Sequence, residues 1–118
     1  MDAGLRLQPR LRFPNDSRLA FGPGKAELLG RIATTGSIRS AAAQMSMSYN
    51  RAWLLVREMN TLFRDKLVIA ARGGATGGGA ILTPLGKEVL QRYTRMERSC
   101  LSATRTDWRA LRTLLAKD

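Results

Sequence analysis

Between residues 49 and 57, polar side chains stand at positions suited to hydrogen bonding with a nucleic acid. The apolar residues Ala52, Val56 and Met59 recur with the three-to-four spacing of a buried helical face. The opposite face then carries Tyr49, Asn50, Trp53 and Arg57. Amide and guanidinium groups pair with the edges of adenine and guanine in the major groove of DNA. The pattern therefore predicts a base-reading helix.

The candidate DNA contacts divide into base-reading and phosphate-binding residues. The first turns of a recognition helix usually make the base contacts, so we expect these from Tyr49, Asn50 and Arg57. Trp53 is left open between packing against a neighbouring helix and lying on DNA. The expected phosphate contacts are Arg39, Ser46, Ser48, Arg51 and Arg72. Ser48 also has the simpler interpretation of a helix cap.

Two helices joined by a tight turn must position this face. Ser37 is a good N-cap for the first helix, whose alanines at 41–43 allow another backbone to approach closely. The segment 45–47 interrupts the helical pattern, and Ser48 caps the second helix. A short helix, a brief turn and a polar-faced helix are typical of a helix-turn-helix, here expected at about residues 37–63.

A glycine-rich hairpin is expected next, at about residues 67–82. Residues 67–72 are rich in β-branched side chains, and 80–82 can form the returning strand. Residues 73–79 contain five glycines in seven. Such a strand pair after a helix-turn-helix predicts a wing, in which Gly77 and Gly78 allow close approach to DNA. A merely flexible loop is the alternative.

A long helix follows Thr83 and Pro84, which form an N-cap and a first helical residue. Its apolar stripe consists of Leu85, Val89, Tyr93, Met96 and Cys100. We expect this stripe to meet a second copy of the chain, the alternative being packing on its own domain. A further helical segment follows Asp107. Residues 1–82 are thus expected to bind DNA and residues 83–118 to dimerise.

The N-terminal segment alternates between apolar and basic residues over positions 5–13, which predicts a half-buried strand. Pro9 marks an edge or a break in it. A returning strand is expected at 18–21 and a first helix near Lys25 to Thr34. Arg6, Arg10 and Arg12 either lie near phosphates or form a solvated strand face.

Composition narrows the class of protein. The sequence contains twenty Lys and Arg residues and nine Asp and Glu residues, which gives a net charge of +11. Sixteen of the twenty basic residues are Arg. This balance favours a polyanionic partner. With one cysteine and no histidine, we expect no disulfide, metal site, cofactor or enzymatic activity. No apolar run reaches the ~18 residues of a membrane span, and no signal peptide is present, so we expect a cytoplasmic protein.

The segments TGSI, SYNRAW and EMN, followed by GGATGGGAILTPLG, resemble the N-terminal DNA-binding domain of the ModE-type molybdate-responsive regulators. The resemblance covers roughly residues 19–100, and its more general features are shared with LysR-type regulators. It implies a mainly α, α+β winged helix-turn-helix that binds a palindromic promoter site as a homodimer. The resemblance also implies that the helix after the wing makes the dimer contact.

One departure from the family concerns its ligand. Family members continue into β-rich domains that bind molybdate, whereas this sequence ends in helix at Asp118. Molybdate binding is therefore not expected for this chain, and whether it is a stand-alone protein or a piece of a longer one stays open. An architectural DNA-binding protein with little sequence preference and a winged-helix adaptor for protein contacts are the alternative functions.

Overall fold

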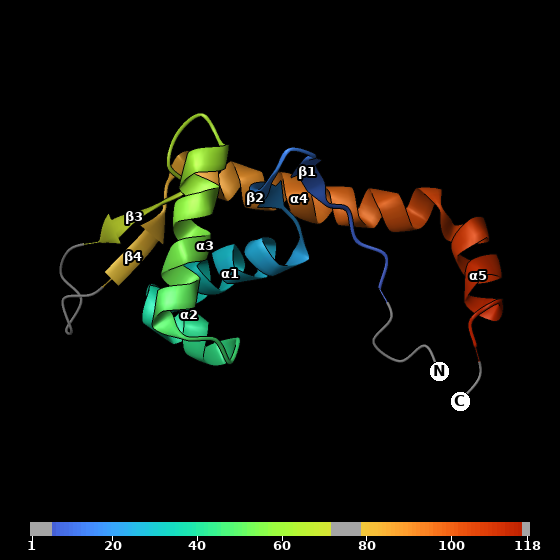
Figure 1. The fold of residues 1–118 in the computed structure, drawn as a ribbon, viewed down its shortest axis with the longest axis horizontal. Coiled ribbons are helices and arrows are strands. Elements are labelled where there is room, and N and C mark those ends of the chain that lie inside the picture. Colours follow the sequence, from blue (N-terminus) through green and yellow to red (C-terminus); the bar gives the residue numbers. More distant parts are fainter. Residues whose placement is uncertain (1–5, 72–78, 117–118) are drawn as a thin grey trace.

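The computed structural model describes residues 6–71 and 79–116. In this part of the chain, two short hairpins accompany five helices (Figure 1). The elements are β1 (Leu11–Phe13), β2 (Asp16–Phe21), α1 (Pro23–Thr35), α2 (Ile38–Gln44), α3 (Tyr49–Leu62), β3 (Val68–Ala71), β4 (Gly79–Leu82), α4 (Pro84–Ala103) and α5 (Arg105–Thr113). The predicted fold class, a mainly helical α+β domain with a helix-turn-helix followed by a hairpin, is confirmed.

Three helices begin at the hydroxyl caps that the sequence predicted. The side chains of Ser37, Ser48 and Thr83 accept the backbone N–H groups of Ser40, Arg51 and Gly86, each at 3.0 Å. Gly36 ends α1 with a φ of 72°, the left-handed conformation that glycine adopts without a steric penalty. Local side-chain chemistry therefore sets the boundaries of α2, α3 and α4.

The β3–β4 hairpin is antiparallel and lies beside α3 (Figure 1). Its register pairs Val68 with Leu82 and Ala71 with Gly79. The amide of Ala80 donates to the carbonyl of Gly36 at 2.9 Å, which fastens the hairpin to the turn between α1 and α2. Asn60 of α3 fastens the start of β3, because its Oδ1 accepts the amides of Leu67 and Val68. The hairpin is thus held at a fixed position relative to the helix-turn-helix.

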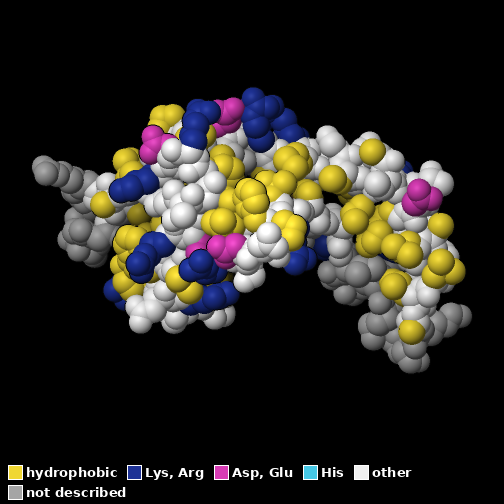
Figure 2. Space-filling model, turned by 45° about the horizontal axis from the view of Figure 1, so that its top comes forward, with side chains coloured by type: hydrophobic (Ala, Val, Ile, Leu, Met, Phe, Trp, Pro, Cys, Tyr) yellow, Lys and Arg dark blue, Asp and Glu magenta, His cyan; other side chains and the backbone are white. Residues whose placement is uncertain are grey.

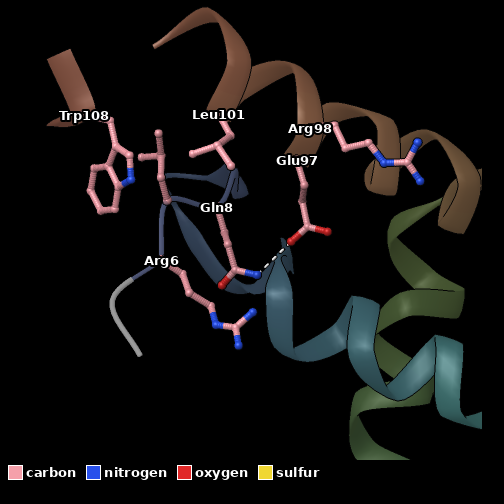
Figure 3. Close-up of a pocket in the computed structure, with 7 residues that line it drawn as sticks. Arg6, Gln8, Glu97, Arg98, Leu101 and Trp108 are labelled. Carbon is pink, nitrogen blue, oxygen red and sulfur yellow. Dashed lines mark hydrogen bonds between the residues drawn. The ribbon is translucent and has the colours of Figure 1, made fainter. Parts of the chain in front are cut away.

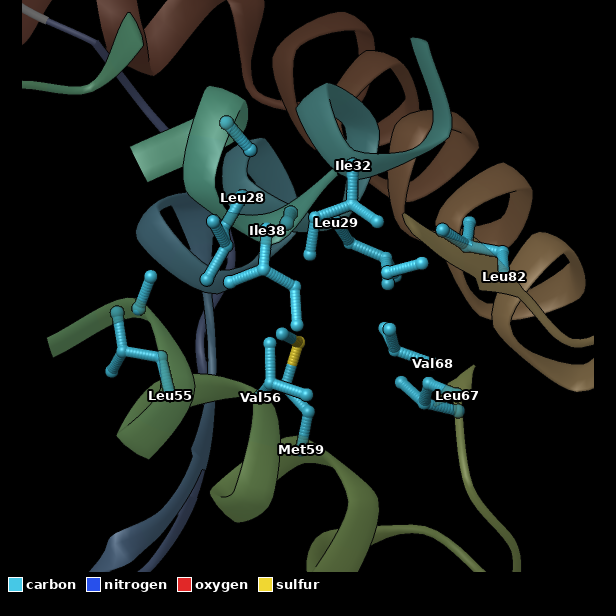
Figure 4. Close-up of a cluster of buried hydrophobic side chains, with 14 of the residues drawn as sticks. Leu28, Leu29, Ile32, Ile38, Leu55, Val56, Met59, Leu67, Val68 and Leu82 are labelled. Carbon is cyan, nitrogen blue, oxygen red and sulfur yellow. The ribbon is translucent and has the colours of Figure 1, made fainter. Parts of the chain in front are cut away.

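The hydrophobic core lies where α1, α2 and α3 meet the β3–β4 hairpin and the start of α4 (Figure 4). Its most deeply buried side chains are Phe21, Leu28, Leu29, Ile32, Val56, Met59 and Leu67. Ala41, Ala42 and Ala52 are also buried, and their small side chains let α2 and α3 approach each other. This contact places the polar side of α3 outward.

Gly86, in the first turn of α4, is required by close backbone packing. A Cβ at this position would lie 2.2 Å from the carbonyl oxygen of Leu67. Gly86→Ala must therefore displace α4 from the backbone of Leu67, and we expect a loss of about 1–3 kcal/mol of unfolding free energy. Thermal unfolding followed by circular dichroism would measure this as a fall in Tm.

Gly24→Ala is the matched control, because nothing lies within 4 Å of a Cβ at Gly24 and its backbone is helical. An equal Tm for the Gly86→Ala variant and the parent protein would contradict the close contact between α4 and Leu67.

The N-terminal segment differs from its prediction. The expected strand over residues 5–13 is limited to Leu11–Phe13 among the described residues, and the side chains of Leu11 and Phe13 remain exposed. The residues before β1 instead pack against α4. There the carbonyl of Pro9 accepts a hydrogen bond from the hydroxyl of Tyr93 at 2.7 Å. Pro9 therefore marks a break in the predicted strand, which is one of the two roles expected for it.

The apolar stripe of α4 divides into two halves. Leu85 and Val89 pack against the core, and Tyr93 is buried with its ring edge-on to Phe21 at 5.4 Å between centroids. Burial raises the pKa of Tyr93. The expectation that Tyr93 faces a partner is thus corrected, because its side chain completes the core of its own domain. Met96 and Cys100 lie beyond that core, where α4 projects from the domain (Figure 1).

Within the described ranges, no helix combines the length and the apolar character needed to cross a membrane.

Candidate nucleic-acid interface

The outer side of α3 is the surface that the sequence analysis identified for base reading. Asn50 and Arg57 are exposed on it, while Ala52, Leu55, Val56 and Met59 are buried beneath. Lys and Arg side chains gather over the part of the molecule that α2 and α3 form, as Figure 2 shows. The outer side of α3 therefore combines hydrogen-bonding groups with positive charge.

Three side chains from α2 and α3 form a connected row on this surface. The guanidinium carbon of Arg39 lies 4.3 Å from the centre of the Tyr49 ring, which is a cation–π contact. The indole Nε1–H of Trp53 donates to the hydroxyl oxygen of Tyr49. Trp53 thus has its only polar hydrogen satisfied, while the Tyr49 hydroxyl can still donate its own hydrogen outward. The row holds Tyr49 from both sides.

Trp53 is not wedged between helices, and 40% of its surface is exposed. It lines a cavity of about 190 Å³ between α3 and the β3–β4 hairpin, together with Tyr49, Val56 and Ile69. Such a position leaves one side of the indole open to a partner. Three further predicted contacts, Arg72, Gly77 and Gly78, lie outside the described residues.

The predicted phosphate contacts border α3 at its N-terminal end. Ser46 is exposed in the turn, with a φ of 55°, and Ser48 caps α3. Arg39 and Arg51 are both exposed, at the start of α2 and on the first turn of α3. The fold therefore places Arg39 on Tyr49 and leaves Ser46, Ser48 and Arg51 near the N-terminal end of α3.

Leu54 is a residue of this surface that the sequence analysis missed. It lies one turn after Asn50 and about one turn before Arg57, so the three share one side of α3. Its side chain is 44% exposed, whereas Leu55 is buried. The signal was present in the Leu54-Leu55 pair, since only one of two consecutive helical residues can face the core.

The carboxylates near this surface are neutralised by ion pairs. Glu58 of α3 meets Lys25 of α1 at 3.0 Å, and both side chains are largely buried. Asp16 pairs with Arg18 at 3.1 Å, and the hydrogen bonds from Arg18 lower the pKa of the Asp16 carboxyl. Acidic groups that would repel a polyanion are thereby offset.

A second candidate surface lies on the arm that the end of α4 and α5 form. Hydrophobic side chains gather along this arm (Figure 2). The exposed ones are Met96, Leu101, Leu111, Leu114 and Leu115. Cys100 is half-buried, and α5 has no buried residue. The apolar side of the arm is therefore left largely uncovered by the described part of its own chain.

The N-terminal segment lines the base of this arm. Arg6, Gln8, Glu97, Arg98, Leu101 and Trp108 surround a cavity of about 330 Å³ (Figure 3). Gln8 Nε2 donates to Glu97 at 2.7 Å.

Elsewhere on α4, the hydrogen bond from Arg92 lowers the pKa of Glu88. Among residues 6–71 and 79–116, no cluster of three or more His, Cys, Asp or Glu side chains could hold a metal ion.

Sequence comparison identifies transcriptional regulators and a molybdenum-pterin-binding protein as relatives. Molybdenum-pterin-binding protein MopB of Rhodobacter capsulatus is 43% identical over 77 residues, which are 65% of this chain and 28% of that protein. The DNA-binding transcriptional dual regulator ModE of Escherichia coli K12 is 42% identical over 76 residues, which are 64% and 29%. The transcriptional regulator ModE of Yersinia pestis is 43% identical over 89 residues, which are 75% and 31%.

No protein-family model matches the chain. The chain spans less than a third of the length of the curated relatives named above. None of their names describes an enzyme, in agreement with the expectation for this chain. The helix-turn-helix, the hairpin after it and the identities of about 40% agree with the resemblance seen in the sequence. The chain is therefore a homologue of the N-terminal domain of the ModE-type transcriptional regulators.

Proposed function

We propose that this protein binds double-stranded DNA sequence-specifically and regulates transcription, with α3 placed in the major groove. The observation that carries the proposal is the outer side of α3, where Asn50 and Arg57 are exposed on one side of the helix and Arg39 and Arg51 are also exposed. A net charge of +11 supports attraction to the phosphate backbone. The DNA-binding role named for the Escherichia coli relative supports the same function.

We assign different roles to the residues of this surface. Asn50 pairs with an adenine edge, and Arg57 reaches a guanine or a phosphate. Arg39 stacks on the ring of Tyr49, and the Tyr49 hydroxyl accepts the Trp53 Nε1–H and donates its own hydrogen to a base or a phosphate. Arg39, Ser46 and Arg51 bind phosphates and set the register of α3 in the groove. Ser48 contributes as the cap of α3.

We also propose that the protein acts as a homodimer on a palindromic site. The support is the exposed apolar side of the arm, which includes Met96, Leu111 and the half-buried Cys100. A two-fold pair places two copies of α3 in successive major grooves, ~34 Å apart. Residues 83–118 then contribute the dimer contact, although Leu85, Val89 and Tyr93 serve the core of residues 1–82. The molybdenum in the name of the Rhodobacter capsulatus relative is not assigned to this chain, which matches less than a third of that protein.

A competition experiment tests this function. Duplexes selected from a random library by the purified protein provide a binding site, which is then labelled for a gel shift. Unlabelled selected duplex is expected to displace the label at least roughly a thousandfold better than random duplex, as specific regulators do. Equal competition would reject sequence-specific regulation and favour an architectural protein. No binding to either duplex would favour an adaptor.

Leu54 is expected to contact the methyl group of a thymine, because this methyl is the apolar feature of the major groove. Replacing the contacted thymine by deoxyuridine removes only that methyl. The substitution should weaken binding by about 0.8 kcal/mol, a factor of about four. Fluorescence anisotropy with singly substituted duplexes would measure the effect.

The Leu54→Ala variant provides the control for this prediction. It should bind thymine and deoxyuridine duplexes equally, because the side chain that meets the methyl is shortened. If deoxyuridine weakens the parent and Leu54→Ala to the same degree at every position, Leu54 does not read thymine.

A further inference from the structure

A cleft lies beside α3, where β2 and the start of α1 meet it. These two elements lie on the side of α3 opposite the β3–β4 hairpin (Figure 1). Its volume is about 360 Å³. Five parts of the chain contribute to its walls: the segment before β1, β2, the start of α1, the turn before α3, and α3 itself. Its charged and hydroxyl-bearing side chains are Arg10, Ser17, Lys25, Arg51 and Glu58.

The lining of this cleft carries an excess of positive charge. Lys25 is satisfied by Glu58 at 3.0 Å and by the carbonyl of Ala20 at 2.7 Å. The charges of Lys25 and Glu58 cancel, so the lining keeps two positive charges, those of Arg10 and Arg51. Neither forms an ion pair with a carboxylate of residues 6–71 or 79–116. Two guanidinium groups that line the same cleft repel each other unless an anion lies between them.

Arg10 is held at the cleft by packing. A Cβ at Gly22 would lie 3.2 Å from Cγ of Arg10 and 3.3 Å from its Nη1, so the side chain lies directly over the Gly22 backbone. The preceding residue is fixed as well, because the carbonyl of Pro9 accepts the Tyr93 hydroxyl. Arg10 thus approaches α3 from a segment that is 41 positions away from Arg51 in the sequence.

We propose that this cleft binds a phosphate of the DNA backbone, with Arg10 and Arg51 as its two donors and Ser17 at its edge. The inference rests on the proposed function, in which α3 lies in the major groove. A groove about 12 Å wide is bordered by two backbones, one on each side of the helix. In this arrangement the β3–β4 hairpin is on the side of one backbone. The cleft, which β2 and the start of α1 line on the opposite side of α3, is on the side of the other.

The salt dependence of DNA binding tests the proposal. The slope of log affinity against log salt should fall in magnitude by about 0.9 for each phosphate that a bound protomer no longer neutralises. We expect this fall for Arg10→Ala and for Arg51→Ala, measured by anisotropy with the selected duplex. Arg12→Ala is the matched control, because this exposed arginine of the next strand does not line the cleft, and its slope should equal that of the parent.

Gly22→Ala is a second test that keeps every charge. The backbone of Gly22 is extended, with φ near −156°, so alanine is tolerated there, while the Arg10 side chain must shift slightly to admit its Cβ. We expect a weaker affinity for the selected duplex with a Tm close to that of the parent. Methylphosphonate linkages, placed one at a time, should reveal a position that weakens the parent more than it weakens Arg10→Ala, because Arg51 still meets that phosphate in the variant.

Several outcomes would overturn the proposal. If Arg10→Ala and Gly22→Ala keep the parent's slope and affinity while Asn50→Ala still loses sequence preference, the cleft holds no DNA phosphate and the proposed function stands. If the parent protein shows no salt-dependent DNA binding, the proposed function itself fails. If inorganic phosphate at matched ionic strength raises the Tm of the parent but not of Arg10→Ala, and the salt slopes agree, the cleft holds a free anion instead.

Discussion

Asn50→Ala is expected to lower affinity for the selected duplex by about 1–3 kcal/mol for each half-site, a factor of roughly 5 to 150. Affinity for random duplex should hardly change. The physical reason is that a bidentate amide–adenine pair exists only at the correct base, while the phosphate contacts are made on any sequence. Asn50 is exposed on the first turn of α3, where alanine is a better helix former, so stability is expected to be retained. Parallel anisotropy titrations with both duplexes measure the difference.

Arg51→Ala is the matched comparison on the same turn of α3. It should weaken selected and random duplexes to a similar degree, because a phosphate contact carries no base information. If Asn50→Ala binds both duplexes as the parent does, α3 is not the base-reading helix in the way proposed here. If the two variants behave alike, the division between base-reading and phosphate-binding residues is wrong.

Leu111→Glu is expected to dissociate the homodimer and to abolish binding to a two-half-site duplex, lowering its affinity more than about a hundredfold. Leu111 is 55% exposed on α5, about one turn after Trp108 on the same side of the helix. A carboxylate placed in a closed apolar contact loses its hydration without gaining a partner. A single half-site should be bound weakly, because each monomer keeps its own α3. Sedimentation equilibrium without DNA, followed by gel shifts on both duplexes, measures the two effects.

Thr106→Glu adds the same charge on the polar side of α5 and serves as the control. It should remain dimeric and bind the selected duplex as the parent does. A dimeric Leu111→Glu variant would show that the arm is not the contact between protomers. If the parent protein is monomeric and still binds the palindrome tightly, the arm is not required for DNA binding.

The local parts of the fold could be predicted from the sequence because their causes are local. Ser37, Ser48 and Thr83 cap helices through hydroxyls that reach amides three residues ahead, and the residue spacing is enough to identify them. The two sides of α3 follow from the helical period, which sends Ala52 and Val56 inward and Asn50 outward. The same reasoning failed for residues 5–13, whose alternation matched a strand. The hydrogen bond from Tyr93 to Pro9 competes with that strand from 84 positions away.

The sequence by itself therefore determined the helix-turn-helix, the hairpin after it and the polar side of the second helix, because caps and periodicity act over a few residues. Only the tertiary structure decided which long-range neighbours these residues have. It placed Arg39 on Tyr49, and it used the first half of the α4 stripe for the core. It also brought Arg10 and Arg51 to one cleft. These contacts depend on how helices and segments pack, and packing is set by the shapes of many side chains at once rather than by residue spacing.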